Sequence, residues 1–154
     1  MMLPRMKKVA LLPVLAIGAL AIGLVTGTPA AGQDVDTQAQ IDNAISAAPS
    51  SVSAASTVLA RELDAAGAFV VLQEGSNGWY CQADDLGTPD PDPMCFDQTW
   101  LDWMYAKGAG EAPTVSAPGF AYMLQGGSEA SNTDPDATEP ADGAEWMISP
   151  PHIM

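Results

Sequence analysis

The segment between the chain's two cysteines, CQADDLGTPDPDPMC at residues 81–95, is rich in aspartate and proline. Carboxylates are the hard oxygen donors that calcium prefers, so four aspartates form a candidate metal site: Asp84, Asp85, Asp90 and Asp92. A disulfide would fold the segment back and bring its two arms together. However, the spacing differs from the EF-hand pattern, and an extended TPDPDP stretch would point Asp90 and Asp92 in different directions. The alternative is an acidic loop that merely caps the core.

Other residues capable of chemistry form weaker patterns. The chain has no nucleophile elbow, zinc-protease, Walker or dinucleotide motif, and His152 is its single histidine, so a hydrolase is a second alternative without nominated catalytic residues. Residues 131–140, SNTDPDATEP, suit either a binding loop or, as we expect, a series of turns. Aromatic residues gather around the cysteines, and we expect them to form core rather than a stacking surface: Trp79, Tyr80, Phe96, Trp100, Trp103 and Tyr105.

The first 32 residues resemble a secretory signal peptide. Three basic residues precede an uncharged apolar run from Val9 to Val25, and small residues suited to a signal peptidase follow. We therefore expect a mature chain that begins near Ala31 or Gln33, in the periplasm or outside the cell. An uncleaved anchor is the alternative, since the run is at the short end of what spans a bilayer. After cleavage, no stable membrane insertion is expected.

Export to an oxidising compartment favours a disulfide between Cys81 and Cys95. A redox pair would more typically show C-x-x-C spacing, and a zinc site would need more ligands than His152 supplies. The mature chain is also strongly acidic, because Arg61 and Lys107 are its only basic residues against 19 acidic ones. Such a charge disfavours nucleic acid and anionic lipid as partners and attracts cations or basic partners.

The elements that must position these residues follow from hydrophobic periodicity and turn residues. The strongest helix signal begins with Asp97 as the N-cap and ends with Lys107 in the last turn before Gly108. Residues 50–67 fit a helix or a strand equally well. We further predict a helix over 33–48, ended by Pro49; a strand, a turn at Asn77 and Gly78, and a second strand over 68–82; a strand over 119–126; a surface loop over 128–145; and an extended run over 145–154.

Four segments, EGSNGWYC, DPMCFDQTWLDWMYA, GFAYMLQGGSEASNTDPDAT and EWMISPPHIM, together resemble an uncharacterised family of small exported bacterial proteins. The resemblance covers roughly residues 70–154 and implies export and a shared domain. It implies no catalytic residues. Beyond the equivalent of PPHIM it implies a further apolar strand and a short terminal block, so we expect the chain to be incomplete at its C-terminus.

Together these features predict a small α+β domain over residues 33–154, in which an antiparallel or mixed sheet packs against one or two helices and carries one disulfide. The expected function is that of an exported, acidic, noncatalytic binding or structural protein with an unknown ligand and no required cofactor. The first alternative is a calcium-binding module that uses the Cys81–Cys95 acidic loop, and the second is a hydrolase of unknown substrate.

Overall fold

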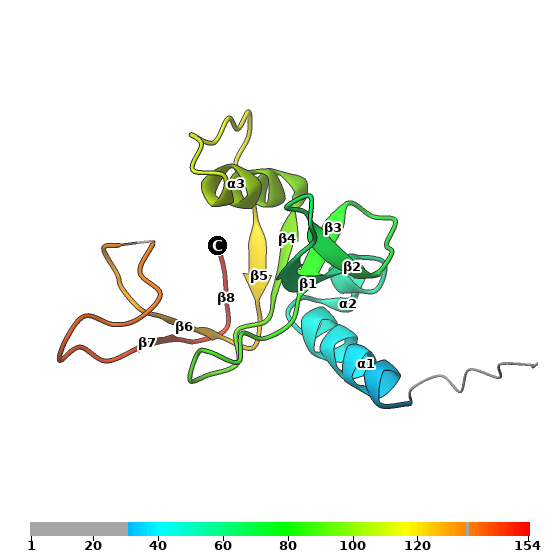
Figure 1. Cartoon of the computed structure of the whole chain (residues 1–154), viewed down its shortest axis with the longest axis horizontal. Coiled ribbons are helices and arrows are strands. Elements are labelled where there is room, and N and C mark those ends of the chain that lie inside the picture. The colour runs from blue at the N-terminus through cyan, green and yellow to red at the C-terminus, as the bar shows by residue number, and fades with distance from the viewer. Residues whose placement is uncertain (1–30, 135) are drawn as a thin grey trace, which may run out of the picture.

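The main sheet of the protein is mixed and has six strands, as a computed structural model shows for residues 31–134 and 136–154. The predicted signal peptide lies outside this range except for its last two residues. Only the pair β1–β3 is parallel, and the other neighbours are antiparallel. The spatial order is β2 (Phe69–Gln73), β1 (Thr57–Leu63), β3 (Trp79–Gln82), β4 (Met94–Asp97), β5 (Ala121–Met123) and β8 (His152–Ile153) (Figure 1). The predicted α+β class is confirmed.

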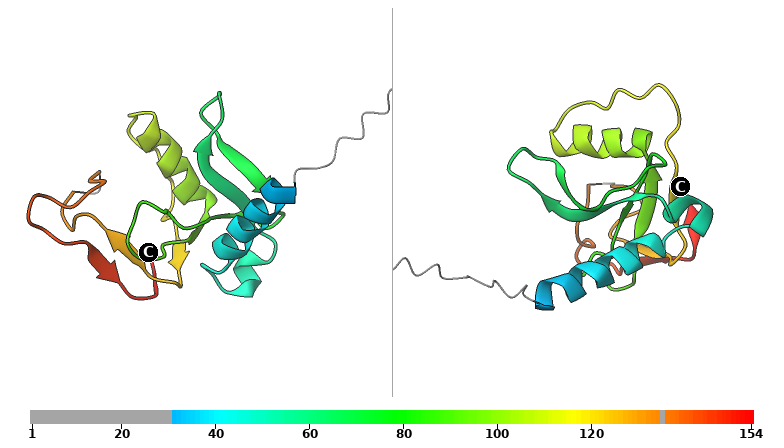
Figure 2. Two further views of the ribbon diagram at one scale, coloured as in Figure 1. Left: turned by 60° about the horizontal axis from the view of Figure 1, so that its bottom comes forward. Right: turned by 90° about the vertical axis from the view of Figure 1, so that its right-hand side faces the viewer.

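Two helices cover opposite faces of this sheet, because successive residues of a strand point to opposite sides. Val58, Cys81 and Cys95 pack with Ile41 and Ala44 of α1 (Ala31–Ile45). The next residue in two of these strands points the other way. Leu59 and Phe96 pack with Leu101 of α3 (Gln98–Gly108) and with Ala121. Figure 2 shows α1 and α3 on opposite sides of the strands. No helix in the described ranges is both long and apolar enough to span a membrane.

Helix α1 ends earlier than the predicted Ala48. The N–H groups of Ser46 and Ala47 bond to carbonyls three residues back, which tightens the chain into a turn before Pro49. Helical geometry is sterically disfavoured for the residue before a proline, so α1 does not continue through Ala48. Pro49 then precedes the one-turn helix α2 (Ser50–Ser53). The ambiguous stretch over 50–67 thus contains both a short helix and strand β1.

Strands β2 and β3 lie where a strand, turn and strand were predicted, but they do not pair with each other. Strand β1 lies between them. The connection crosses back over the start of β1, since Gly75 N–H donates to Thr57 Oγ1 at 3.1 Å and Ser76 N–H donates to the Ala55 carbonyl at 2.8 Å. Asn77 Oδ1 then accepts a hydrogen bond from Trp79 N–H at 3.1 Å and forms the predicted turn.

The predicted helix after Cys95 is confirmed, with Asp97 as its N-cap. Asp97 Oδ1 accepts a hydrogen bond from Trp100 N–H at 2.9 Å, which satisfies one of the unpaired donors of the first turn. The other oxygen, Oδ2, accepts from Phe120 N–H at 2.9 Å. One carboxylate therefore fixes the start of α3 and also the approach to β5.

A two-stranded arm extends from the end of the main sheet (Figures 1 and 2). It consists of β6 (Gly127–Glu129) and β7 (Met147–Ser149), paired antiparallel. The predicted strand over 119–126 is too long, because the chain turns after Met123 at Gly126, whose φ is 91°. The extended run over 145–154 is divided between two sheets. Pro150 and Pro151 lack the N–H needed to continue a ladder, so β7 ends before them and β8 begins after them.

Candidate functional site

The disulfide between Cys81 and Cys95 is present and joins neighbouring strands. The two residues lie directly opposite each other in the β3–β4 ladder and are fully buried on the α1 side of the sheet. The connection between these strands is the acidic loop, which we define as residues 83–93. The disulfide therefore closes the base of this loop, and β4 leads from it directly into the N-cap of α3.

Asp92 is the centre of the acidic loop and is only 9% exposed. Its Oδ1 accepts a hydrogen bond from Asp85 N–H at 2.7 Å and from Arg61 Nη2 at 3.1 Å. Its Oδ2 lies 3.0 Å from the hydroxyl of Thr88. In the opposite direction, Asp84 Oδ1 accepts from Asp92 N–H at 2.7 Å. These reciprocal bonds join the two arms of the loop, so the loop has a polar interior of its own.

Of the four aspartates in the candidate calcium site, the structure joins three. Asp84, Asp85 and Asp92 are linked by the bonds above. Asp90 lies apart from them, and its backbone N–H donates a hydrogen bond to Ser128 Oγ of β6 at 3.2 Å. Among the residues described, no three His, Cys, Asp or Glu side chains are arranged to hold a metal ion. Calcium binding here stays a prediction, and a calcium ion would compete with Arg61 for the oxygens of Asp92.

Burial raises the pKa of Asp92 above its ordinary value of 3.8, because desolvation outweighs the hydrogen bond from Asp85 N–H and the charge of Arg61. The pKa of this carboxyl is higher in the folded state than in the unfolded state. At a pH between these two pKa values, the folded state therefore binds more protons than the unfolded state. The free energy of unfolding contributed by this group is therefore highest below 3.8 and decreases as the pH rises through the raised pKa.

Replacing Asp92 with asparagine should remove this pH dependence. In Asp92→Asn the side-chain oxygen still accepts from Asp85 N–H, and the new amide can donate to Thr88. We expect the wild-type protein to lose stability relative to Asp92→Asn as the pH rises from about 4 to about 7. Urea unfolding across this range measures the difference, with Asp90→Asn as the control for loss of one loop charge. Parallel profiles for wild type and Asp92→Asn would contradict the assignment.

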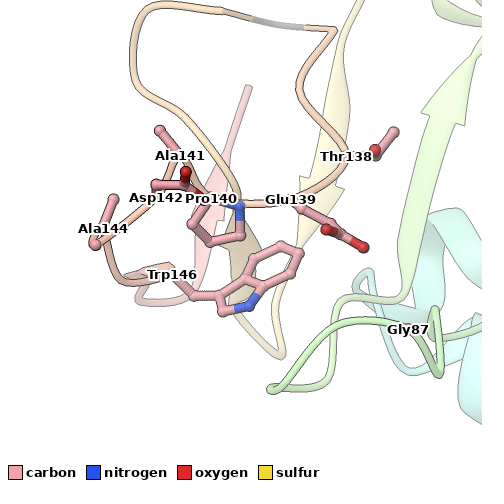
Figure 3. Close-up of a pocket in the computed structure, with 9 residues that line it drawn as sticks. Gly87, Thr138, Glu139, Pro140, Ala141, Asp142, Ala144 and Trp146 are labelled. Atoms are coloured by element: carbon pink, nitrogen blue, oxygen red, sulfur yellow. The ribbon is translucent and has the colours of Figure 1, made fainter.

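A hollow lies between the tip of the acidic loop and the β6–β7 arm. It has a volume of about 640 Å³ and is lined by Gly87, residues 138–144 and Trp146. We call it the Trp146 cleft. In Figure 3 the indole of Trp146 lies beside the ring of Pro140, and the carboxylate of Glu139 points toward the loop that carries Gly87. A second hollow of about 340 Å³ shares Thr138 and Trp146 and reaches Asp85 and Thr88. The half-buried indole thus lines both.

The two charged residues that line this cleft, Glu139 and Asp142, are both acidic. Arg61 forms ion pairs with Asp85 and Asp92 at 3.6 and 3.1 Å. Lys107 forms one with Asp136 at 2.6 Å. Within residues 31–134 and 136–154, no ion pair involves Glu139 or Asp142, which line the cleft. Both basic residues of this part of the chain are thus engaged elsewhere.

Within the segment over 131–140, the described residues form turns, as predicted. Ser131 Oγ accepts from the N–H groups of Thr133 and Asp134 at 3.2 and 3.0 Å, and Asp134 Oδ1 accepts from Asp136 N–H at 2.9 Å. Its last residues nevertheless form one wall of the cleft. Sequence reasoning missed Trp146, which lies on the same wall. The available signal was a lone tryptophan at the end of the predicted surface loop over 128–145, far from the other aromatic residues in sequence.

The aromatic residues near the cysteines behave mostly as core. Phe96 is fully buried, and Tyr80 stacks on it with the ring centroids 6.3 Å apart. Trp100 and Trp103 are half-buried and line a smaller apolar hollow of about 210 Å³ beside Pro118. His152 lies on the edge strand β8, where its Nδ1 is 2.7 Å from the Pro150 carbonyl oxygen. The hydrolase alternative gains no named residue from this geometry and stays a prediction.

Comparison of the chain with protein-family models, with curated proteins and with solved structures gave no match. The resemblance of residues 70–154 to exported bacterial proteins therefore stays a prediction. The geometry of the cleft carries the functional argument.

Proposed function

We propose that the protein is an exported, acidic, noncatalytic binding protein whose ligand site is the Trp146 cleft. The observation that carries this proposal is a half-buried indole in the wall of a hollow of about 640 Å³. Ligand sites are typically hollows of roughly 300–1,000 Å³ in which an aromatic side chain and a few polar groups converge. The signal-like N-terminus and the disulfide support export.

The lining of the cleft favours binding over catalysis. The described residues that line the cleft include no histidine, cysteine, serine or lysine. Among them, only Thr138 carries a hydroxyl group. A nucleophile activated by a neighbouring base would need such a pair. The lining instead offers an aromatic face, a proline ring and two carboxylates. A calcium-binding module at the acidic loop and a hydrolase stay the alternatives.

The two walls of the cleft are joined to each other, and each is also fixed by bonds of its own. The acidic loop is closed at its base by the Cys81–Cys95 disulfide and is joined to β6 by the bond between Asp90 N–H and Ser128 Oγ. On the arm, Glu129 accepts a hydrogen bond from Ser149 Oγ at 2.9 Å. A preformed site avoids part of the entropy cost of ordering its loops when a ligand binds. The fixed walls therefore support ligand binding without a large rearrangement of the loops.

Ligand binding at the cleft should appear in the NMR signal of one indole. The chain has four tryptophans, so uniformly ¹⁵N-labelled protein gives four indole N–H signals, and Trp146→Phe identifies that of Trp146. We expect members of a fragment library with neutral, anionic and cationic compounds to shift the Trp146 signal and leave that of Trp79 in place. If no fragment moves Trp146, the cleft is not a ligand site and the proposal is wrong.

A further inference from the structure

We infer that the ligand of the Trp146 cleft is an organic cation, whose ammonium group lies against the indole and is attracted by the carboxylates of Glu139 and Asp142. This inference rests on the proposed function and specifies its ligand class. The cavity and its indole provide the site, and the acidic residues that line it favour a cation over a neutral or anionic ligand.

The electrostatics of the cleft favour a cationic ligand. Glu139 and Asp142 are exposed, line the cleft, and form no ion pair with the described part of the chain. Negative charge in a hollow with low-dielectric walls raises the local concentration of cations and repels anions. An anionic ligand would therefore be repelled by these carboxylates, and a cation would be attracted by them.

The protein already holds one of its own ammonium groups between an indole and a carboxylate. Lys107 Nζ lies 5.1 Å from the centre of the Trp103 ring and 2.6 Å from Asp136 Oδ1. An ammonium within about 6 Å of an indole centroid is attracted by the negative face of the ring. The Trp146 cleft presents the same two kinds of group, an indole and carboxylates, without a basic residue among those that line it. An external ammonium can take the role that Lys107 has at Trp103.

The groups that line the cleft suit an organic cation better than a metal ion. Calcium takes six to eight oxygen ligands, and no group of three acidic, histidine or cysteine side chains in residues 31–134 and 136–154 is arranged to hold a metal. An indole does not replace the oxygen ligands of a strongly hydrated metal ion, whereas its face attracts an ammonium group that carries alkyl substituents. The volume of about 640 Å³ also accommodates a whole small organic cation.

Choline and 3,3-dimethylbutan-1-ol test this inference, because they have the same shape and differ in charge. We expect calorimetric titration to show choline binding at least about tenfold more tightly than the neutral alcohol, with an affinity that weakens as sodium chloride is added. Glu139→Gln and Asp142→Asn should each weaken choline binding about threefold to tenfold. Glu62→Gln makes the same charge change at an exposed position of β1 outside the cleft and should leave binding within about twofold.

The outcomes separate this inference from the proposed function. Equal binding of the alcohol and choline, with the Trp146 signal shifted by both, would overturn the choice of a cation and leave the cleft as a ligand site. Equal weakening by Glu62→Gln and Glu139→Gln would show that choline responds only to the overall charge, which also overturns the inference. Displacement of choline by calcium chloride beyond that by sodium chloride of equal ionic strength would indicate a metal site instead. Near-UV circular dichroism confirms that each variant is folded.

Discussion

Replacing Asp92 with alanine should lower the free energy of unfolding by about 2–3 kcal/mol at neutral pH. The substitution removes the acceptor for Asp85 N–H and the partner of Arg61, and it leaves a cavity in a site that is 9% exposed. A buried donor without an acceptor costs more than the net value of the hydrogen bond that is lost. Urea unfolding followed by tryptophan fluorescence measures the change.

Asp90→Ala is the matched control for this experiment. It removes the same charge from the same loop, but the Asp90 side chain forms no hydrogen bond or ion pair with residues 31–134 or 136–154. It is the backbone N–H of Asp90 that bonds to Ser128. We expect a change of less than about 0.5 kcal/mol for this control. Equal destabilisation by Asp90→Ala and Asp92→Ala would mean that Asp92 does not organise the loop.

Removal of the disulfide should have an effect of similar or greater size. We expect the double variant Cys81→Ala/Cys95→Ala to lose about 3 kcal/mol and about 10 °C in melting temperature, since the link constrains a loop with a sequence separation of 14 in the unfolded chain. Alanine is chosen because both positions are fully buried and a serine hydroxyl there would need a partner. Differential scanning calorimetry of the variant and the wild type measures the loss.

Chemical reduction of the wild-type protein provides the control, because it breaks the link without changing the side-chain volume. A melting temperature that falls in the variant and not in the reduced protein would assign the effect to packing at the α1 side of the sheet. An unchanged transition in both would show that the disulfide contributes no stability.

Local signals in the sequence predicted several elements well. Asp97 at the N-cap, Lys107 in the last turn and Gly108 at the end are short-range features, and the structure places α3 at Gln98–Gly108. The disulfide followed from cysteine number and expected compartment. By contrast, the insertion of β1 between β2 and β3 depends on long-range pairing, which neighbouring residues do not encode.

The candidate site was predicted only in part. Counting oxygen donors singled out the four aspartates of the acidic loop, but it did not show that Asp92 is directed inward by Asp85 N–H and Arg61. The Trp146 cleft is formed by two segments more than 40 positions apart in sequence, and the division of the last strand at Pro150 decides where the arm lies. Such a surface follows from tertiary packing and has no sequence motif of its own.

The acidic loop and the cleft are connected in this account. Asp92 and the disulfide fix the loop, and the loop supplies the wall at Gly87, so variants that loosen the loop should also weaken ligand binding at Trp146. The binding loss in Asp92→Ala is expected even though Asp92 does not line the cleft.

The most direct measurement of the central claim is the nuclear Overhauser effect between the methyl protons of choline and the tryptophan rings. We expect contacts from these protons to the ring of Trp146, and their loss when Glu139 and Asp142 are both replaced by their amides. Contacts to Trp100 or Trp103 alone would place the ligand in the smaller hollow beside Pro118 and contradict the assignment of the Trp146 cleft.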